Sequence, residues 1–287
     1  MIKKSIYTAV VLLILFEVFI RTLNIQWDTS QNDKSANLIT AQNFIYNFPD
    51  KEISHDTVIV GSSISRKLIT DSLGKNYLNL AFNAWSSYEG LELLNLTKKK
   101  PACVMIEMNV VGDTVMEQDV LNSMNALSFN VNELFKSFQL QNQPVGILIG
   151  YFKNKLKAKM EELKRKKREN QDLYKYNLQQ EKETMTKILP DSVFSARFNV
   201  LSKLVETFKK ENINIIFFEI PMDNELENTP LVLTTRALFH KYFPDSTYRY
   251  IAMQSTNKYI YSDGIHLSLQ SALPYTLYLK NAINNRN

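Results

Sequence analysis

A chain of 287 residues with 45% hydrophobic and 22% charged residues has the composition of a folded protein and not of a disordered one. Its 34 basic and 29 acidic residues give a net charge of +5, and much of the excess lies in the stretch 153–168, so the charge does not indicate a nucleic-acid-binding surface. The single cysteine, Cys103, excludes an intramolecular disulfide, and with three histidines in all we expect neither a metal site nor another cofactor.

The N-terminus predicts a membrane-spanning helix. Two lysines precede a mostly apolar run at residues 6–23, close to the ~20 residues that a helix needs to cross a bilayer. Glu17 and Arg21 interrupt the run, but they lie four residues apart on one helical face and can pair. The lysines favour a cytoplasmic N-terminus, with Trp27 at the far interface and residues 28–287 outside the cytoplasm. A cleaved signal peptide is the alternative, although no typical cleavage site follows the run.

Beyond this anchor, residues 1–27, we expect a stalk and one α/β domain. Residues 28–55 are polar and mixed, with one short helix expected around 38–46. Residues 56–287 alternate short apolar runs with helix-like segments, which is typical of a doubly wound parallel sheet. The predicted strands are 57–60, 77–82, 102–108, 213–220 and 259–261, and the main predicted helices are 64–73, 86–98 and 268–283.

Residues 112–195 interrupt this alternation. The segment is long, favours helix and contains the basic run, so we interpret it as a helical insertion over the C-terminal edge of the sheet and not as a second domain. A solvated helix face is the simplest interpretation of the run 153–168. Contact with anionic lipid headgroups or with a membrane partner is the functional alternative.

A glycine and two serines, Gly61-Ser62-Ser63, end the first predicted strand, and a helix is expected to follow at once. A serine at such a turn lies at the C-terminal edge of the sheet, where open α/β sheets bind ligands. Its backbone N–H lies at a helix N-terminus, a position suited to stabilising a developing oxyanion. The same pattern also fits two serines that only cap the helix.

The second candidate segment, Asp263-Gly264-Ile265-His266, precedes the last predicted helix. A nucleophilic serine needs a neighbouring base, and histidine, with an ordinary pKa of about 6.5, is the usual one. A carboxylate that accepts the other ring N–H fixes the tautomer. Since Asp263 and His266 lie three residues apart, one turn can present both to the same pocket. The other histidines, His55 and His240, lie in polar surroundings and are expected on the surface.

Together the two segments resemble the first and fifth sequence blocks of the SGNH (GDSL) hydrolase superfamily. In that family the serine at the position of Ser63 is the nucleophile, and Ser62 stands where aspartate is usual. The resemblance implies an SGNH-like three-layer sandwich in which Ser63, Asp263 and His266 form a catalytic triad.

The middle blocks of the family have partial matches. The segment after the second predicted strand resembles the second block, with Ala84 where the family has a glycine whose N–H binds the oxyanion. The segment after the third strand resembles the third block: Asn109 matches its asparagine, while Glu107 replaces the usual glycine and Val110 the usual aspartate. The resemblance implies an oxyanion hole made by the N–H groups of Ser63 and Ala84 and the side chain of Asn109.

The membrane tether, the Gly-Ser-Ser variant and the helical insertion are similar to membrane-anchored SGNH proteins that work on cell-envelope polymers beside a multi-spanning acyltransferase. The resemblance implies serine-dependent acyl transfer or ester hydrolysis, such as O-acetylation chemistry, on an envelope polysaccharide or related glycopolymer in the periplasm or at the cell surface. The implied partners are the membrane, a multi-spanning acyltransferase and a carbohydrate substrate, with no nucleic acid. The alternative is a catalytically inactive SGNH-fold protein whose cleft binds glycan or an envelope partner. Water and a sugar hydroxyl both stay open as the acyl acceptor.

Overall fold

The computed structural model describes residues 2–22, 28–47, 56–97, 100–110, 126–168 and 171–284, and of residues 47, 126–129, 158–168 and 171 it describes the backbone alone. The chain divides into two compact units, residues 1–48 with 118–163 and residues 49–117 with 164–287. The segment interpreted above as one insertion, 112–195, is therefore shared between the two units, and its first residues, 112–125, lie outside the described residues.

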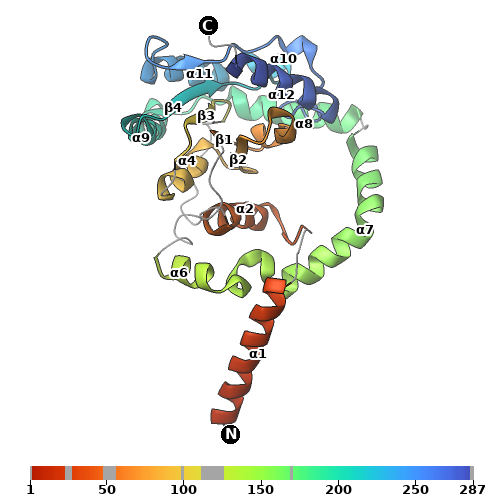
Figure 1. Cartoon of the computed structure of the whole chain (residues 1–287). Coiled ribbons are helices and arrows are strands. Elements are labelled where there is room, and N and C mark those ends of the chain that lie inside the picture. The colour runs from red at the N-terminus through yellow and green to blue at the C-terminus, as the bar shows by residue number, and fades with distance from the viewer. Residues whose placement is uncertain are drawn as a thin grey trace. The chain divides into compact units, whose positions relative to one another are not determined.

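The second unit is built on a five-stranded, all-parallel sheet, so its fold is of the α/β class (Figure 1). The strand order is β2-β1-β3-β4-β5. The strands are β1 (Thr57–Gly61), β2 (Tyr77–Ala81), β3 (Cys103–Glu107), β4 (Asn214–Phe218) and β5 (Arg249–Tyr250). The first four are the predicted ones to within two residues at each end. They could be predicted because strands covered on both faces are nearly continuous apolar runs.

The predicted fifth strand at 259–261 is wrong. Within it, Tyr261 forms only an isolated antiparallel bridge, to Leu267. The fifth strand of the sheet is instead β5, which pairs with β4 through Ile216 and Phe217. Two residues are too few to produce a recognisable alternation in the sequence.

Helices cover both faces of the sheet. They are α3 (Thr70–Leu73), α4 (Ser87–Leu96), α8 (Gln171–Thr186), α9 (Asp191–Lys210), α10 (Asn224–Glu227), α11 (Pro230–Tyr242) and α12 (Leu269–Asn284). Helix α4 packs on β1, β2 and α9, and α9 packs on β4, whereas α3 packs against α12. The connection from β1 to β2 runs in one direction along the sheet, and those from β2 to β3 and from β3 to β4 run in the other. Right-handed connections in opposite directions place their helices on opposite faces, so α4 and α9 form one layer and α3 and α12 the other.

Two helix predictions near the first strand have different outcomes. The predicted helix 64–73 is in fact two short pieces, the 3₁₀ turn η1 (Ser65–Lys67) and α3, because Leu68 between them has extended backbone angles. The next predicted helix, 86–98, is confirmed as α4, which Ser86 caps in a capping box with Glu89.

The strand order places the site. Chain order reverses between β1 and β3, and in open α/β sheets a crevice forms outside the carboxyl ends of the strands at such a switch point. Ser62 and Ser63 directly follow β1, and Asn109 follows β3 after one intervening residue. The candidate residues from the first and third sequence blocks therefore lie at the edge of the sheet where a ligand is expected.

The first unit is helical. Its elements are α1 (Ile2–Thr22), α2 (Asp33–Asn47), α6 (Ala126–Leu134), the 3₁₀ turns η2 (Lys136–Phe138) and η3 (Leu140–Asn142), and α7 (Pro144–Arg168), whose last residues belong to the second unit. Helix α2 is longer than the helix predicted at 38–46. The rest of the predicted stalk, 48–55, and the predicted interfacial residue Trp27 lie outside the described residues.

Helix α1 is long and apolar enough to cross a membrane. Its apolar side chains are largely exposed; among them are Ile6, Val10, Ile14 and Val18. The predicted pairing is confirmed, since Arg21 Nε lies 2.7 Å from Glu17 Oε1. An exposed apolar surface on a helix of this length is what a membrane-spanning segment presents before a bilayer surrounds it.

Candidate active site

Three side chains from the two candidate segments form one chain of hydrogen bonds. Ser63 Oγ lies 2.9 Å from His266 Nε2, and Asp263 Oδ2 lies 2.8 Å from His266 Nδ1. The serine and the histidine are 203 residues apart in sequence and come from the turns after β1 and before α12. The imidazole is 16% exposed, so it is shielded but accessible. This is the arrangement of nucleophile, base and orienting carboxylate that serine-dependent acyl transfer uses.

The turn that carries Asp263 and His266 is held by its own backbone. Asp263 Oδ1 accepts the N–H groups of His266, at 2.9 Å, and Ile265, at 3.2 Å. The N–H of Ser262 donates to the carbonyl oxygen of His266 at 2.8 Å and closes the turn. Gly264 has φ +101°, a backbone conformation that side-chain-bearing residues rarely adopt. One carboxylate oxygen of Asp263 therefore holds the turn, and the other holds the imidazole ring. A spacing of three residues is enough for one carboxylate to make both contacts.

The carboxyl group of Asp263 is stabilised in its charged form. Burial alone would raise its pKa, but the hydrogen bond from the His266 ring, the charge of the imidazolium and the N–H groups of His266 and Ile265 outweigh burial, so the pKa of Asp263 lies below its ordinary value of 3.8. Asp263 therefore stays ionised at neutral pH, as the orienting role requires.

Ser62 points away from this site and into a buried network. Its Oγ donates to Glu107 Oε1 at 2.8 Å, and its N–H donates to Glu107 Oε2 at 2.8 Å. The N–H of Ser65 also donates to Glu107 Oε2, at 3.1 Å. Ser62 and Glu107 are both almost fully buried, at 2% and 1% exposure. The carboxyl group at the end of β3 thus holds both sides of the turn that carries Ser63.

The approach of Glu107 to this turn requires the glycine at the end of β1. A Cβ atom at Gly61 would lie 2.2 Å from Ser65 Oγ and 2.5 Å from Glu107 Oε2, closer than such atoms can come. Burial raises the pKa of Glu107, although the hydrogen bonds from Ser65 and Ser62 act in the opposite direction. In the sequence, Glu107 differs from the glycine of the family pattern, but nothing near it predicts this structural role.

The two remaining oxyanion-hole candidates lie at the same edge of the sheet. Ala84 has φ +54°, in the left-handed region that favours glycine, which agrees with the glycine expected at this position. In the part of the chain that the structure describes, neither the N–H of Ser63 nor that of Ala84 has a hydrogen-bond partner. The amide of Asn109 is fixed by the backbone of Ile220: Nδ2 donates to its carbonyl at 2.7 Å and Oδ1 accepts its N–H at 2.9 Å. One hydrogen of Nδ2 remains for a ligand.

Helix α8 supports the turn that carries the base, a contact that sequence analysis did not predict. The hydroxyl of Tyr174 donates to Asp223 Oδ2 at 2.6 Å, and the N–H of Asp223 donates to the carbonyl oxygen of Gly264 at 2.8 Å. Leu178 packs so closely on Gly264 that an added Cβ would lie 2.7 Å from its Cδ1. The sequence signal for this contact is weak, because one aromatic and one leucine a turn apart on a polar helix are common.

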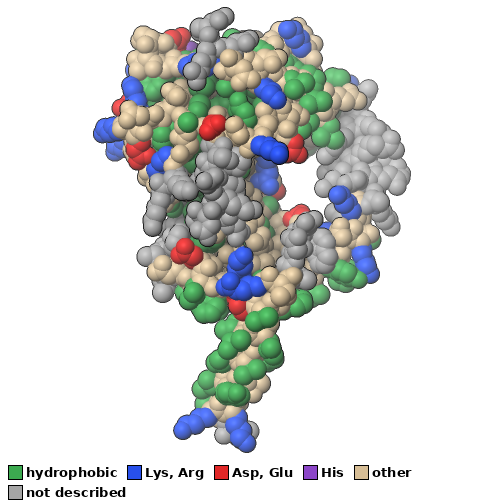
Figure 2. All heavy atoms as spheres, in the orientation of Figure 1, with side chains coloured by type: hydrophobic (Ala, Val, Ile, Leu, Met, Phe, Trp, Pro, Cys, Tyr) green, Lys and Arg blue, Asp and Glu red, His purple; other side chains and the backbone are tan. Residues whose placement is uncertain are grey.

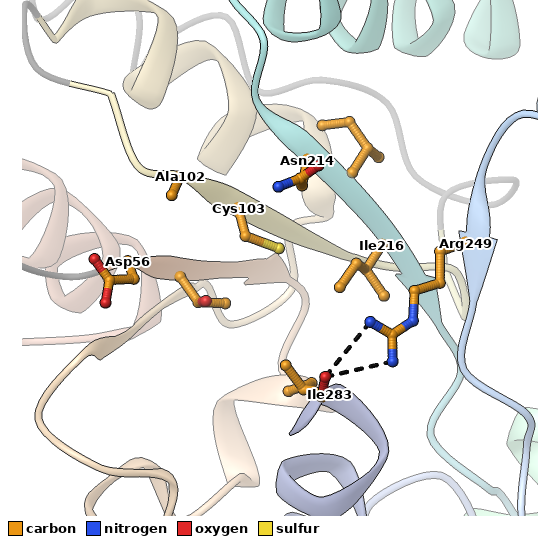
Figure 3. Close-up of a pocket in the computed structure, with 9 residues that line it drawn as sticks. Asp56, Ala102, Cys103, Asn214, Ile216, Arg249 and Ile283 are labelled. Carbon is orange, nitrogen blue, oxygen red and sulfur yellow. Dashed lines mark hydrogen bonds between the residues drawn. The ribbon is translucent and has the colours of Figure 1, made fainter. Parts of the chain in front are cut away.

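A cleft of about 410 Å³ lies at the opposite edge of the sheet from this site. It is lined by residues at the amino ends of β1, β3 and β4 and by Arg249 and Ile283 (Figure 3). The guanidinium of Arg249 donates to the carbonyl oxygens of Ala282 and Ile283, so it caps the C-terminal end of α12. Burial raises the pKa of Cys103, which faces this cleft, to about 11, so its thiol is unreactive at neutral pH.

Neither a model of a known protein family nor a curated protein sequence matches the chain. Over the described ranges, no group of three or more His, Cys, Asp and Glu side chains could hold a metal ion. The functional interpretation therefore depends on the geometry of the site and on the resemblance of its motifs.

Replacing Glu107 tests the buried network. Glu107→Ala leaves the N–H groups of Ser62 and Ser65 without their acceptor, and we expect it to lower the free energy of unfolding by about 3 kcal/mol. Glu107→Gln keeps an acceptor oxygen and the volume, so the loss should be about 1 kcal/mol. Denaturant unfolding of both variants measures the difference. Equal losses would show that the charge matters and the acceptor geometry does not.

The lowered pKa of Asp263 predicts a pH dependence of stability. A carboxyl group whose pKa is depressed by folding stabilises the protein above its unfolded pKa, here 3.8, and this contribution is lost as the pH falls through the folded value. We therefore expect the difference in free energy of unfolding between the wild type and Asp263→Asn to shrink as the pH falls below about 5. A difference that does not change over this range would contradict the assignment.

The backbone at Ala84 predicts different effects on stability for two substitutions. Ala84→Gly removes the strain of a left-handed alanine, about 1 kcal/mol, and loses a similar amount through a more flexible unfolded chain, so its melting temperature should be nearly unchanged. Ala84→Val adds a branched side chain at the same φ and should lower the stability by more than about 1 kcal/mol. Thermal unfolding of the pair is the measurement, and equal stability of both variants would show that the backbone relaxes at this position.

Proposed function

We propose that the chain is an SGNH-type serine esterase or O-acyltransferase with Ser63 as nucleophile, His266 as general base and Asp263 as the residue that orients the histidine. The observation that carries this proposal is the hydrogen-bond chain from Ser63 Oγ to His266 Nε2 and from His266 Nδ1 to Asp263. The three residues of this hydrogen-bond chain are those that match the first and fifth sequence blocks of the family. The buried Ser62–Glu107 network supports the same assignment, because it directs one serine of the pair away from the site and leaves the other beside the base.

The proposed reaction proceeds through an acyl ester on Ser63. Oγ attacks the acyl carbon while its proton passes to His266 Nε2, and Asp263 keeps the second ring proton on Nδ1. When the tetrahedral intermediate breaks down, the bond to the leaving oxygen breaks and Nε2 returns the proton to that oxygen. In the second half His266 removes a proton from water or a sugar hydroxyl, whose oxygen attacks the acyl carbon. The bond from this carbon to Ser63 Oγ then breaks, and Nε2 returns the proton to Oγ. Water as acceptor gives hydrolysis, and a sugar hydroxyl gives transfer.

Three donors would stabilise the negative charge that develops on the acyl oxygen. They are the N–H groups of Ser63 and Ala84 and the second hydrogen of Asn109 Nδ2. Removing one such donor typically costs about 3 kcal/mol of transition-state stabilisation. The contacts of Asn109 with Ile220 support this role, because a side chain already held by two hydrogen bonds needs no reorganisation when the charge appears.

The substrate, partner and location are proposed from the resemblance and the anchor. The proposed substrate is an envelope polysaccharide or related glycopolymer, and the proposed partner is a multi-spanning acyltransferase. With α1 in a membrane and lysines before it, the N-terminus is cytoplasmic and the α/β unit extracytoplasmic. The anchor, the motif and the insertion together support this branch of the family by analogy.

A serine-directed fluorophosphonate probe tests the proposed nucleophile. The wild type should be labelled covalently and Ser63→Ala should not, while the stability of the variant is nearly unchanged because Ser63 is not fully buried. Ser62→Ala is the matched control. It should keep labelling at Ser63, although losing the buried hydrogen bonds of its hydroxyl with Glu107 and with the N–H of Ile64 should cost about 1–3 kcal/mol of stability.

Mass spectrometry of the labelled peptide identifies the modified serine. Labelling that survives in Ser63→Ala and disappears in Ser62→Ala would shift the assignment by one residue. No labelling of a folded wild type would leave the chain as a protein that binds glycan or an envelope partner without catalysis.

A further inference from the structure

The ion pair of α1 fixes the end of this helix to the junction between α6 and η2. Glu17 accepts the N–H groups of Lys136, at 3.0 Å, and Ser137, at 2.9 Å, which are the first residues of η2. Arg21 Nη2 donates to the carbonyl oxygen of Leu134, the last residue of α6, at 2.8 Å. Helix ends leave such N–H and carbonyl groups without partners inside the helix. The charged pair supplies both partners and so holds α6 and η2 beside the last turns of α1.

The first half of α7 is tied to the residues that follow α1. Lys153 Nζ lies 3.1 Å from Asp28 Oδ2 and also donates to the carbonyl oxygen of Ser30. A Cβ atom at Gly146 would lie 3.1 Å from the carbonyl oxygen of Thr29, so the helix packs closely on this segment. Within this unit, Figure 1 shows α6 on one side of the end of α1 and the beginning of α7 on the other.

Both flanking segments present large apolar side chains to the outside. We define the collar as the exposed residues Leu134, Phe135 and Phe138 of the α6–η2 segment and Val145, Leu148 and Phe152 of α7. Leu134, Leu148 and Phe152 are each about 60% exposed, at 64%, 59% and 59%. Hydrophobic side chains gather around the end of α1 in Figure 2, over α6 and the beginning of α7.

The α7 part of the collar is a stripe on an amphipathic helix. Val145, Leu148 and Phe152 recur at the three- and four-residue intervals of one helical face. Gly146 and Lys153, which contact residues 28–30, lie on another face. Lysines at 155 and 157 follow the stripe and are exposed, which is the pattern of helices that lie in a membrane interface.

We propose that the collar lies at the boundary between headgroups and acyl chains of the same bilayer that α1 crosses, with Lys155 and Lys157 meeting anionic phospholipid headgroups. The collar is continuous with the apolar surface of α1, since Val18 and Phe19, on the last turns of that helix, are half-exposed. Six large apolar side chains around a membrane anchor would otherwise face water, which folded proteins avoid. We commit to the bilayer as the occupant of this surface, because the Glu17–Arg21 pair holds the α6–η2 part of the collar at the end of the apolar helix, and Lys153 ties α7 to the residues that follow this helix.

The test uses the full-length chain with Cys103→Ser and one new cysteine at a time, each carrying an environment-sensitive fluorophore. The protein is reconstituted alone into vesicles of phosphatidylcholine and phosphatidylglycerol that contain nitroxide lipids, labelled near the headgroup for the positions on α7 and deep in the acyl chain for the position on α1. The collar positions are Leu148→Cys and Phe152→Cys. The matched control is Asn154→Cys, an exposed residue on another face of the same helix, and Leu13→Cys reports insertion of α1. Far-ultraviolet circular dichroism shows that each variant is folded.

We expect quenching at both collar positions to exceed that at Asn154→Cys by at least about threefold, since an interfacial helix buries its apolar face in the acyl boundary. Collar positions quenched no more than the control, with Leu13→Cys quenched, would overturn the proposal and leave a membrane protein partner as the occupant. Quenching that vanishes when the protein is diluted in lipid would assign the surface to a second copy. Absence of quenching at Leu13→Cys would remove both the anchor and the collar from the bilayer. Labelling of Ser63 is independent of all these outcomes.

Discussion

The buried carboxyl group of Glu107 is the contact on which the rest of the site depends. It joins the end of β3 to the turn after β1 by accepting hydrogen bonds from the hydroxyl and the N–H of Ser62 and from the N–H of Ser65. Carboxyl groups are rarely buried so completely unless every oxygen has partners, and here both oxygens accept hydrogen bonds from the same turn. The turn therefore has one conformation, in which Ser62 faces inward and Ser63 faces His266. The family resemblance places an aspartate at position 62 and a glycine at 107, so in this chain the acidic group stands on the neighbouring strand.

The other half of the site is held from three directions. Asp263 closes its own turn, Asp223 binds the backbone of Gly264, and Leu178 packs on the glycine from α8. Since Asp263 and His266 belong to one turn, this turn and the turn with Ser63 are the two parts that must be aligned to form the hydrogen-bond chain. Helix α8 follows α7 in the chain, and α7 begins in the helical unit that contains α1. The helix that supports the turn with His266 is thus continuous in sequence with the proposed collar.

Much of this architecture could be predicted from sequence because its signals are local. Buried parallel strands are apolar runs, so the strands at 57–60, 102–108 and 213–220 can be predicted. The turns with Ser63 and His266 are short sequence patterns next to a predicted strand or helix. What could not be predicted depends on contacts between distant residues. The backbone partners of Glu107 are 42 and 45 residues away in sequence, and those of Glu17 are 119 and 120 residues away. Such distant contacts produce no periodic pattern in the sequence. The same reason explains why 112–195 was assigned to one insertion, since its first half associates with α1 through such contacts. The family assignment and the catalytic role of the triad stay predictions.

The Glu17–Arg21 pair also means that this anchor is not interchangeable. A generic apolar helix of equal length would hold the chain at a membrane, but it would leave the start of η2 without its acceptor and the end of α6 without its donor. For an α1 that crosses a membrane, each of the two charges is costly in the bilayer until it is paired. Insertion of such a helix and folding of its unit would be coupled: the last turns gain all their partners only after residues 134–137, made more than a hundred residues later, have folded beside them.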